Sequence, residues 1–164
     1  MLDSVSGNEP VAIRDRAILL LLSVYGVRSG ELRRLGLDDI DWVHDRIVIE
    51  RSKSRRREEL ALHPLVGDAI VRYLREARPA VSSRHAFLTV RAPFRPLTAC
   101  TLHNIIYRRY PAGEAPSRGR GPHGLRHACA RQLVESDYSF KQVGDYLGHR
   151  SPDSTRVYAK VALR

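Results

Sequence analysis

Cysteine is rare in this sequence, and long apolar runs are absent. The two cysteines, Cys100 and Cys129, lie far apart, which argues against a disulfide framework or a zinc site. The longest apolar run, residues 17–27, is interrupted by Ser23 and Gly26 and is too short to span a bilayer. The N-terminus has no basic segment followed by an apolar one. We therefore expect no secretion signal, no membrane association, and a reduced setting in the cytoplasm or nucleoid.

Negative charge is also scarce. Lys and Arg together number 28 against 18 Asp and Glu, which leaves a net charge of +10. Such an excess favours polyanionic partners, nucleic acid first, because cationic side chains release the counterions condensed on phosphates. The length of 164 residues and the hydrophobic content of 43% are ordinary for one compact globular domain.

Lysine is the third scarce residue type. The 28 basic residues include only Lys53, Lys141 and Lys160, so the remaining 25 are arginine. Genomic base composition is one source of such a bias. The bias nevertheless makes the position of each lysine informative, because an arginine guanidinium titrates too high to give up a proton readily.

Carboxylates suited to a pair of metal ions are lacking. The one acidic group comprises Asp38, Asp39, Asp41 and Asp45, which flank a predicted strand turn and are interpreted as solvated loop residues. We therefore expect neither a metal nor another cofactor.

Hydrophobic periodicity and capping residues predict a mainly helical α+β domain with one small three-stranded antiparallel sheet. The predicted helices cover residues 10–26, 29–35, 64–77, 98–110, 124–135, 140–147 and 152 to the end. Ser139 is the expected cap of the sixth helix and Gly148 its expected stop. The segment 111–121, rich in Pro and Gly, is a predicted loop.

The predicted sheet carries a strongly basic hairpin. Ile47, Ile49 and Arg51 alternate with Val48 and Glu50, and a second strand follows the tip "RSKSRRR". Basic residues of this hairpin and of the loop at 111–121 are candidate DNA contacts: Arg51, Arg55, Arg56, Arg57, Arg118 and Arg120.

Two short motifs hold further candidates. In "PHGLRHACARQL", His123 and Arg126 are three residues apart and can face the same side of a helix start. In "YGVRSGELRRLG", Arg28 follows the end of a buried helix, with Glu31 three residues later. Each motif also has a plain structural interpretation, as a solvated basic helix end and as a local ion pair. The neighbouring His127 is interpreted as structural, pointing elsewhere on its helix.

Together with "LGH" and "VYAKV" near the end of the chain, these motifs form an ordered set. From about residue 12 to residue 161 the sequence resembles the tyrosine recombinase (phage integrase) family. The matching elements are an arginine in "G-x-R-x-x-E-L", a hairpin lysine, "H-x-x-R", the histidine of "LGH" and a tyrosine. They fall on Arg28 with Glu31, Lys53, His123 with Arg126, His149, and Tyr158.

The resemblance implies strand cleavage of double-stranded DNA without a metal. Tyr158 would be the nucleophile, and Arg28 and Arg126 would stabilise the phosphate in the transition state. Lys53 would be the general acid for the departing 5′ oxygen. His123 and His149 would handle protons and hydrogen bond the phosphate.

Two other activities remain possible at this point. One is a DNA-binding module that keeps the fold without turnover, and the other is an activity like that of type IB topoisomerases. The family also implies a tetrameric synapse on DNA for full-length members. Because no N-terminal core-binding domain is expected before residue 12, the sequence predicts a single catalytic domain over 1–164, excised or naturally short, with weak self-association.

Overall fold

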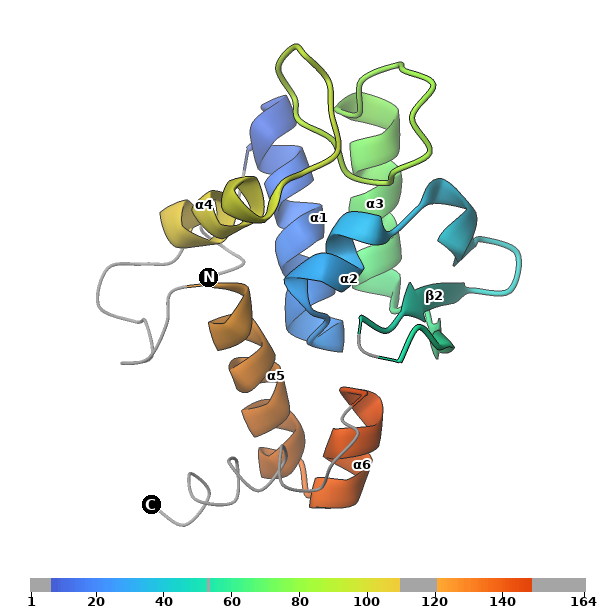
Figure 1. Ribbon diagram of the computed structural model, residues 1–164, viewed down its shortest axis with the longest axis vertical. Helices are drawn as coiled ribbons and strands as arrows, with labels where there is room; N and C mark the ends of the chain where they lie inside the picture. Colours follow the sequence, from blue (N-terminus) through green and yellow to red (C-terminus); the bar gives the residue numbers. More distant parts are fainter. Residues whose placement is uncertain (1–6, 53, 110–120, 149–164) are drawn as a thin grey trace.

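The computed structural model describes residues 7–52, 54–109 and 121–148. The helices in these ranges are α1 (Pro10–Tyr25), α2 (Ser29–Arg34), α3 (Pro64–Glu76), α4 (Ala99–Arg109), α5 (Pro122–Glu135) and α6 (Phe140–Tyr146), with a 3-10 turn, η2 (Leu37–Asp39). The strands are β1 (Ile40–Asp41), β2 (Arg46–Glu50) and β3 (Arg57–Ala61). The described part of the chain thus has the mainly helical α+β architecture expected from the sequence (Figure 1).

Helix α1 is the centre of the molecule. It runs between α3 and α4, with α2 in front of it, and α5 starts beside its lower part and runs downward (Figure 1). Its centre, residues 17–22, is apolar around the whole circumference, as expected for a core helix, and Ile18, Leu19 and Leu21 have no exposed surface. Gly26 ends the helix in the left-handed conformation, with φ of 56°.

The three strands form one antiparallel sheet in the order β1-β2-β3. Ile47 pairs with Leu60 and Val48 pairs with Glu59 across β2 and β3. Because side chains alternate along a strand, Ile47 and Ile49 both point into the core and are at most 1% exposed. The sheet therefore packs one face on the helices and leaves the other to solvent.

The interior consists of two apolar clusters. The main cluster surrounds α1 and includes residues of α2, α3, α4 and the sheet. The second lies between α5 and α6 and comprises Cys129, Ala130, Val143 and Leu147. Tyr146 packs against both clusters, and its hydroxyl donates a hydrogen bond to the carbonyl oxygen of Val24 at 2.9 Å.

The predicted limits of the later helices are partly confirmed. Ser139 caps α6 by accepting a hydrogen bond from the Gln142 N–H at 3.3 Å, and Gly148 follows α6 with φ of 65°. Helix α5 begins at Pro122, two residues earlier than expected, which places His123 in its first turn. The helix predicted from residue 152 lies outside the described residues.

Candidate active site

The site begins where α1 stops. A Cβ atom added to Gly26 would lie 2.6 Å from Cδ2 of Leu147 and 3.2 Å from Sγ of Cys129. Glycine is therefore required here by its left-handed backbone and by the close approach of α5 and the end of α6. Two residues later, Arg28 is the N-cap of α2, so the short break between two helices sets the direction of its side chain.

Glu31 holds Arg28 in place from the first turn of α2. Its carboxylate accepts hydrogen bonds from the backbone N–H of Arg28 at 2.8 Å and from Nη1 of the Arg28 guanidinium at 2.9 Å. The Glu31 side chain is fully buried, whereas that of Arg28 is 25% exposed. The local ion pair considered from the sequence therefore exists, and it leaves Arg28 at the surface of a pocket.

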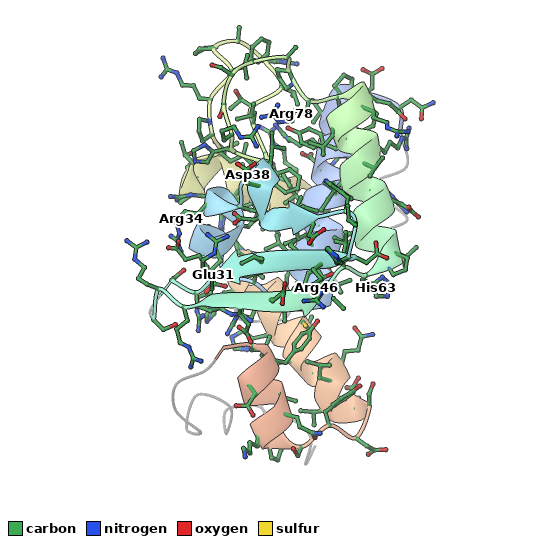
Figure 2. All side chains as sticks on the ribbon, turned by 90° about the vertical axis from the view of Figure 1, so that its right-hand side faces the viewer. Glu31, Arg34, Asp38, Arg46, His63 and Arg78 are labelled. Atoms are coloured by element: carbon green, nitrogen blue, oxygen red, sulfur yellow. The ribbon has the colours of Figure 1, made fainter. Side chains whose placement is uncertain are left out.

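Glu31 also connects α2 to the basic hairpin. Its Oε1 accepts a hydrogen bond from the backbone N–H of Ser52 at 3.1 Å. Arg34, one turn further along α2, donates to the Ser52 hydroxyl at 3.0 Å. Figure 2 shows Glu31 beside strands β2 and β3, toward the end of these strands that is opposite to Arg46. Ser52, the residue directly before Lys53, is thus bonded from both its backbone and its side chain.

The surroundings of Glu31 keep it ionised. Burial alone would raise the pKa of its carboxyl. The hydrogen bonds from Arg28 and Ser52, together with the charge of Arg51, outweigh burial and leave the pKa below its ordinary value. The charged carboxylate balances the two neighbouring guanidinium groups of Arg28 and Arg51.

Arg51 does not lie where the sequence analysis expected it. It was predicted to contact DNA, but it is 3% exposed and its guanidinium is engaged inside the protein. Nε donates to Glu58, Nη1 lies 3.5 Å from Oε2 of Glu31, and Nη2 donates to the carbonyl oxygen of Tyr146 at 2.9 Å. The surface contact predicted for Arg51 is therefore wrong, because Nε, Nη1 and Nη2 are all engaged by protein partners and the side chain does not line a surface pocket.

The other hairpin arginines are exposed. Arg55 pairs with Glu50 at 2.6 Å and Arg57 pairs with Asp39 at 2.6 Å, and the two arginine side chains are 74% and 60% exposed. Arg56 is also exposed. Their role in DNA binding stays a prediction.

Arg126 is buried at the junction of α1, α5 and α6. Nη1 donates to the carbonyl oxygen of Gly26 at 2.6 Å, and Nη2 donates to that of Leu147 at 2.6 Å. Both oxygens belong to helix C-termini, where carbonyl groups lack helical partners and carry partial negative charge. The guanidinium is thereby fixed in direction, and it is 4% exposed.

His123 stands at the start of the same helix and is exposed. Its ring meets the ring of His127 edge to face, with centroids 4.7 Å apart. His127 was expected to point elsewhere, but residues four apart on a helix lie on one face, and the two rings touch. Burial, followed by the charges of His123 and Arg126, lowers the pKa of His127 and favours its neutral form.

These groups converge on an open pocket of about 400 Å³, which is lined by Arg28, Ser29, Gly30, Ser52, Pro122, His123 and Arg126. The pocket thus brings together three predicted catalytic residues: Arg28 from the break after α1, and His123 and Arg126 from α5. Ser52, which precedes Lys53 in the sequence, lines the same pocket. Two guanidinium groups and an imidazole at one opening form a site suited to a phosphate group.

Five predicted site residues lie outside the described residues: Lys53, Arg118, Arg120, His149 and Tyr158. Two of them follow directly on described positions of the site, since Ser52 precedes Lys53 and Gly148 precedes His149.

No group of three or more metal-binding side chains gathers within residues 7–52, 54–109 and 121–148. In the same ranges, every helix is too short or too polar to cross a membrane.

Comparison with known proteins matches the whole chain. The model of the phage integrase family covers residues 1–164. The chain is 44% identical over 154 residues to the putative integrase/recombinase y4gC of Sinorhizobium fredii, covering 93% of this chain and 79% of that protein. It is 35% identical over 159 residues to the tyrosine recombinase XerC of Mycobacterium tuberculosis, covering 94% of this chain and 52% of XerC.

Solved structures share the fold. The XerH site-specific recombinase bound to its difH substrate superposes with a TM-score of 0.80 at 22% identity, over 96% of this chain and 47% of that one. The Tn1549 transposon integrase in complex with transposon right end DNA gives a TM-score of 0.75 at 19% identity, over 96% and 57%. These likenesses confirm the expected fold. The chain spans only about half the length of XerC and of these structures.

Proposed function

Because the chain belongs to the phage integrase family, we propose that it is the catalytic part of a site-specific DNA recombinase, which cleaves and rejoins DNA through a covalent 3′-phosphotyrosyl intermediate. One observation supports this most directly. Arg28, His123 and Arg126, which are distant in sequence, line a single pocket beside Ser52. A site for one DNA phosphate needs such an arrangement.

The two arginines are the proposed phosphate clamp. Their guanidinium groups donate planar, charge-assisted hydrogen bonds to non-bridging phosphate oxygens and remain charged at any working pH. Preorganised donors stabilise the additional charge of the transition state without having to reorient. The bonds of Arg28 to Glu31 and of Arg126 to Gly26 and Leu147 supply this preorganisation.

The proposed chemistry conserves the energy of the phosphodiester. The Tyr158 oxygen attacks phosphorus, a tyrosyl–phosphorus bond forms, and the bond from phosphorus to the 5′ oxygen breaks. The departing oxygen takes a proton from Lys53, and the tyrosine proton passes to His149 or to water. His123 hydrogen bonds a phosphate oxygen. Reversal of these steps with a different 5′ hydroxyl joins the new strands.

Double-stranded DNA is the proposed partner. The net charge of +10 and the exposed arginines of the hairpin support it. The XerH structure is a complex with its difH substrate, and the Tn1549 integrase structure is a complex with transposon right end DNA. Assembly into a tetrameric synapse on DNA, which the family implies for its full-length members, is part of the proposal.

A trapping experiment tests the proposal. The chain is incubated with a pool of nicked duplexes of random sequence, in which the short 5′ fragment diffuses away after cleavage and leaves the protein attached. The expected result is a covalent adduct that survives denaturation, and sequencing of the trapped DNA identifies preferred sites. Tyr158→Phe should form no adduct, whereas Tyr138→Phe, which alters an exposed tyrosine elsewhere, should react normally.

The outcomes separate the alternatives. DNA binding without any adduct would leave only a DNA-binding module of the same fold. Relaxation of supercoiled plasmid without joining of two duplexes would instead identify an activity of the type IB topoisomerase kind.

A further inference from the structure

Arg51 is a buried cation that the proposed chemistry does not use. It directly follows β2, and its side chain is 4% exposed. Its guanidinium contacts three carbonyl or carboxylate groups: Glu58 through Nε, Glu31 through Nη1 at 3.5 Å, and the Tyr146 carbonyl through Nη2 at 2.9 Å. All three kinds of nitrogen in this side chain are therefore engaged.

Each partner belongs to a different segment of the site. Glu58 lies on β3, Glu31 lies on α2 and holds Arg28, and Tyr146 is the last residue of α6. The hairpin tip is closed at Arg51 itself, whose N–H donates to the Arg56 carbonyl at 2.9 Å and whose carbonyl accepts from the Arg55 N–H at 2.9 Å. One side chain thus joins the base of the hairpin tip, the helix that orients Arg28, and the end of α6.

The backbone of Gly148, just after α6, lies very close to the Arg51 side chain. A Cβ added at Gly148 would lie 2.8 Å from Nε and 3.0 Å from Cδ of Arg51. Its φ of 65° is also one that glycine adopts at little cost. The backbone that leads into His149 is therefore packed directly on Arg51.

A buried arginine is a poor choice if only stability is needed. Desolvation of the ions offsets most of their attraction, and apolar side chains of similar volume stabilise a core as well or better. The guanidinium instead fixes geometry, because its planar set of donors holds three partners in defined directions.

We propose that Arg51 is a positioning residue for strand cleavage, which sets the hairpin tip, α2 and the end of α6 relative to one another. Arg28 belongs to one of these segments, and the other two end at Ser52 and Gly148, which adjoin Lys53 and His149 in the sequence. The inference rests on the proposed function but assigns a role to a residue that touches neither DNA nor the reacting atoms.

Four variants test this role. Arg51→Met removes the guanidinium, and Arg51→Lys keeps one charge that cannot reach three partners. Arg51→Met combined with Glu58→Gln also removes the carboxylate left unpaired, which separates folding from positioning. Arg46→Met is the matched control, because Arg46 lies on β2, the strand that Arg51 follows, carries the same charge, and forms an exposed pair with Glu59 at 2.8 Å.

Three quantities are measured for each variant: the thermal midpoint, the dissociation constant for a duplex recovered from the trapped pool, and the single-turnover rate of adduct formation at saturating DNA. Rates are measured well below each midpoint, so that all of the protein is folded. Arg51→Met and the double variant should cleave about 100-fold more slowly, as expected for reacting groups displaced by about an ångström. Their dissociation constants should change less than about threefold, because the guanidinium that is removed is buried and releases no counterions from DNA phosphates.

Arg51→Lys should fall between Arg51→Met and the wild type, and Arg46→Met should match the wild type in rate. A folded double variant that cleaves at the wild-type rate would overturn the positioning role and leave Arg51 a structural residue. A weaker DNA affinity with an unchanged single-turnover rate at saturating DNA would do the same. If the wild type itself formed no adduct, the proposed function would fail first, and the role of Arg51 with it.

Discussion

Arg126 and Leu147 are joined by a 2.6 Å hydrogen bond from the guanidinium to the carbonyl oxygen that follows α6. The same guanidinium bonds Gly26 at the end of α1. Arg126 therefore offsets the partial negative charge of two helix ends while lining the pocket. Support for the fold and contact with the proposed phosphate depend on one side chain.

This relationship predicts that Arg126→Lys lowers both stability and activity. One ammonium group cannot bridge the two carbonyl oxygens in the same geometry, so a buried acceptor loses its donor, which costs about 1–3 kcal/mol. Adduct formation should slow by about 10²–10³-fold, as for the loss of a transition-state donor. Urea unfolding and single-turnover cleavage measure the two effects. Arg131→Lys, an exposed change on the same helix, should alter neither.

Lys53 should act on the leaving group alone. Lys53→Ala should slow cleavage of an ordinary duplex by about 10²–10⁴-fold, the usual contribution of general acid catalysis. A duplex with sulfur in place of the bridging 5′ oxygen needs no acid, because a thiol ionises near pKa 8.5 and leaves as the thiolate. The variant should cleave this second substrate at close to the wild-type rate.

Lys141→Ala is the matched control, because Lys141 is exposed on α6. Equal losses on the oxygen and sulfur substrates after Lys53→Ala would exclude the general-acid role.

His127 should make the fold sensitive to mild acid. Burial lowers the pKa of His127, with the charges of His123 and Arg126 acting in the same direction, so the unfolded chain binds this proton more tightly. The stability gained from the neutral ring is present above the unfolded pKa of about 6.5 and is lost as the pH falls through the lower folded pKa. Thermal midpoints between pH 8 and pH 5 should therefore drop in the wild type and drop less in His127→Gln.

The contribution of Glu31 to stability changes in a separate, more acidic pH range. Its pKa is lowered, so its contribution is lost only as the pH falls below the ordinary range of a glutamate. A wild-type midpoint that stayed constant down to pH 5 would contradict the assignment to His127. The exposed His103 provides the control substitution, His103→Gln.

The two cysteines should differ sharply toward thiol reagents. Burial raises the pKa of the Cys129 thiol to about 11, and this thiol donates a hydrogen bond to the Val24 carbonyl at 3.4 Å. Cys100 is exposed on α4. A maleimide should label the folded protein once, at Cys100, and should reach Cys129 only after unfolding. Mass spectrometry of the wild type and of Cys100→Ser checks both statements.

Local signals predicted the elements well. The capping pair Ser139 and Gly148 delimits α6, and the apolar run ended by Gly26 gives α1, because caps and left-handed stops act within a single turn of chain. The grouping of Arg28, His123 and Arg126 followed from their resemblance to a family rather than from any local pattern. Their meeting at one pocket depends on how α5 packs under α1, which no short stretch of sequence determines.

Two sequence patterns make opposite predictions about the burial of Arg51. It belongs to a basic run, which favours the surface, and it continues the inward alternation of Ile47 and Ile49, which favours the interior. The alternation prevailed because Glu31, Glu58 and the end of α6 supply partners for a buried guanidinium. Glu58 belongs to the same hairpin, but Glu31 and the end of α6 come from other segments, so the sequence around Arg51 contains no sign of those two partners.

The division of the interior into two apolar clusters has a further consequence. The cluster between α5 and α6 has few buried side chains and is linked to the larger one through Tyr146. Small clusters open at a lower free energy than the whole fold, so amide protons of α6 should exchange with deuterium sooner than those of α1. The carboxyl-terminal half of α5 and α6 are therefore the first part of the fold to open, whereas the first turns of α5, which line the pocket, are held to the main cluster through Leu125.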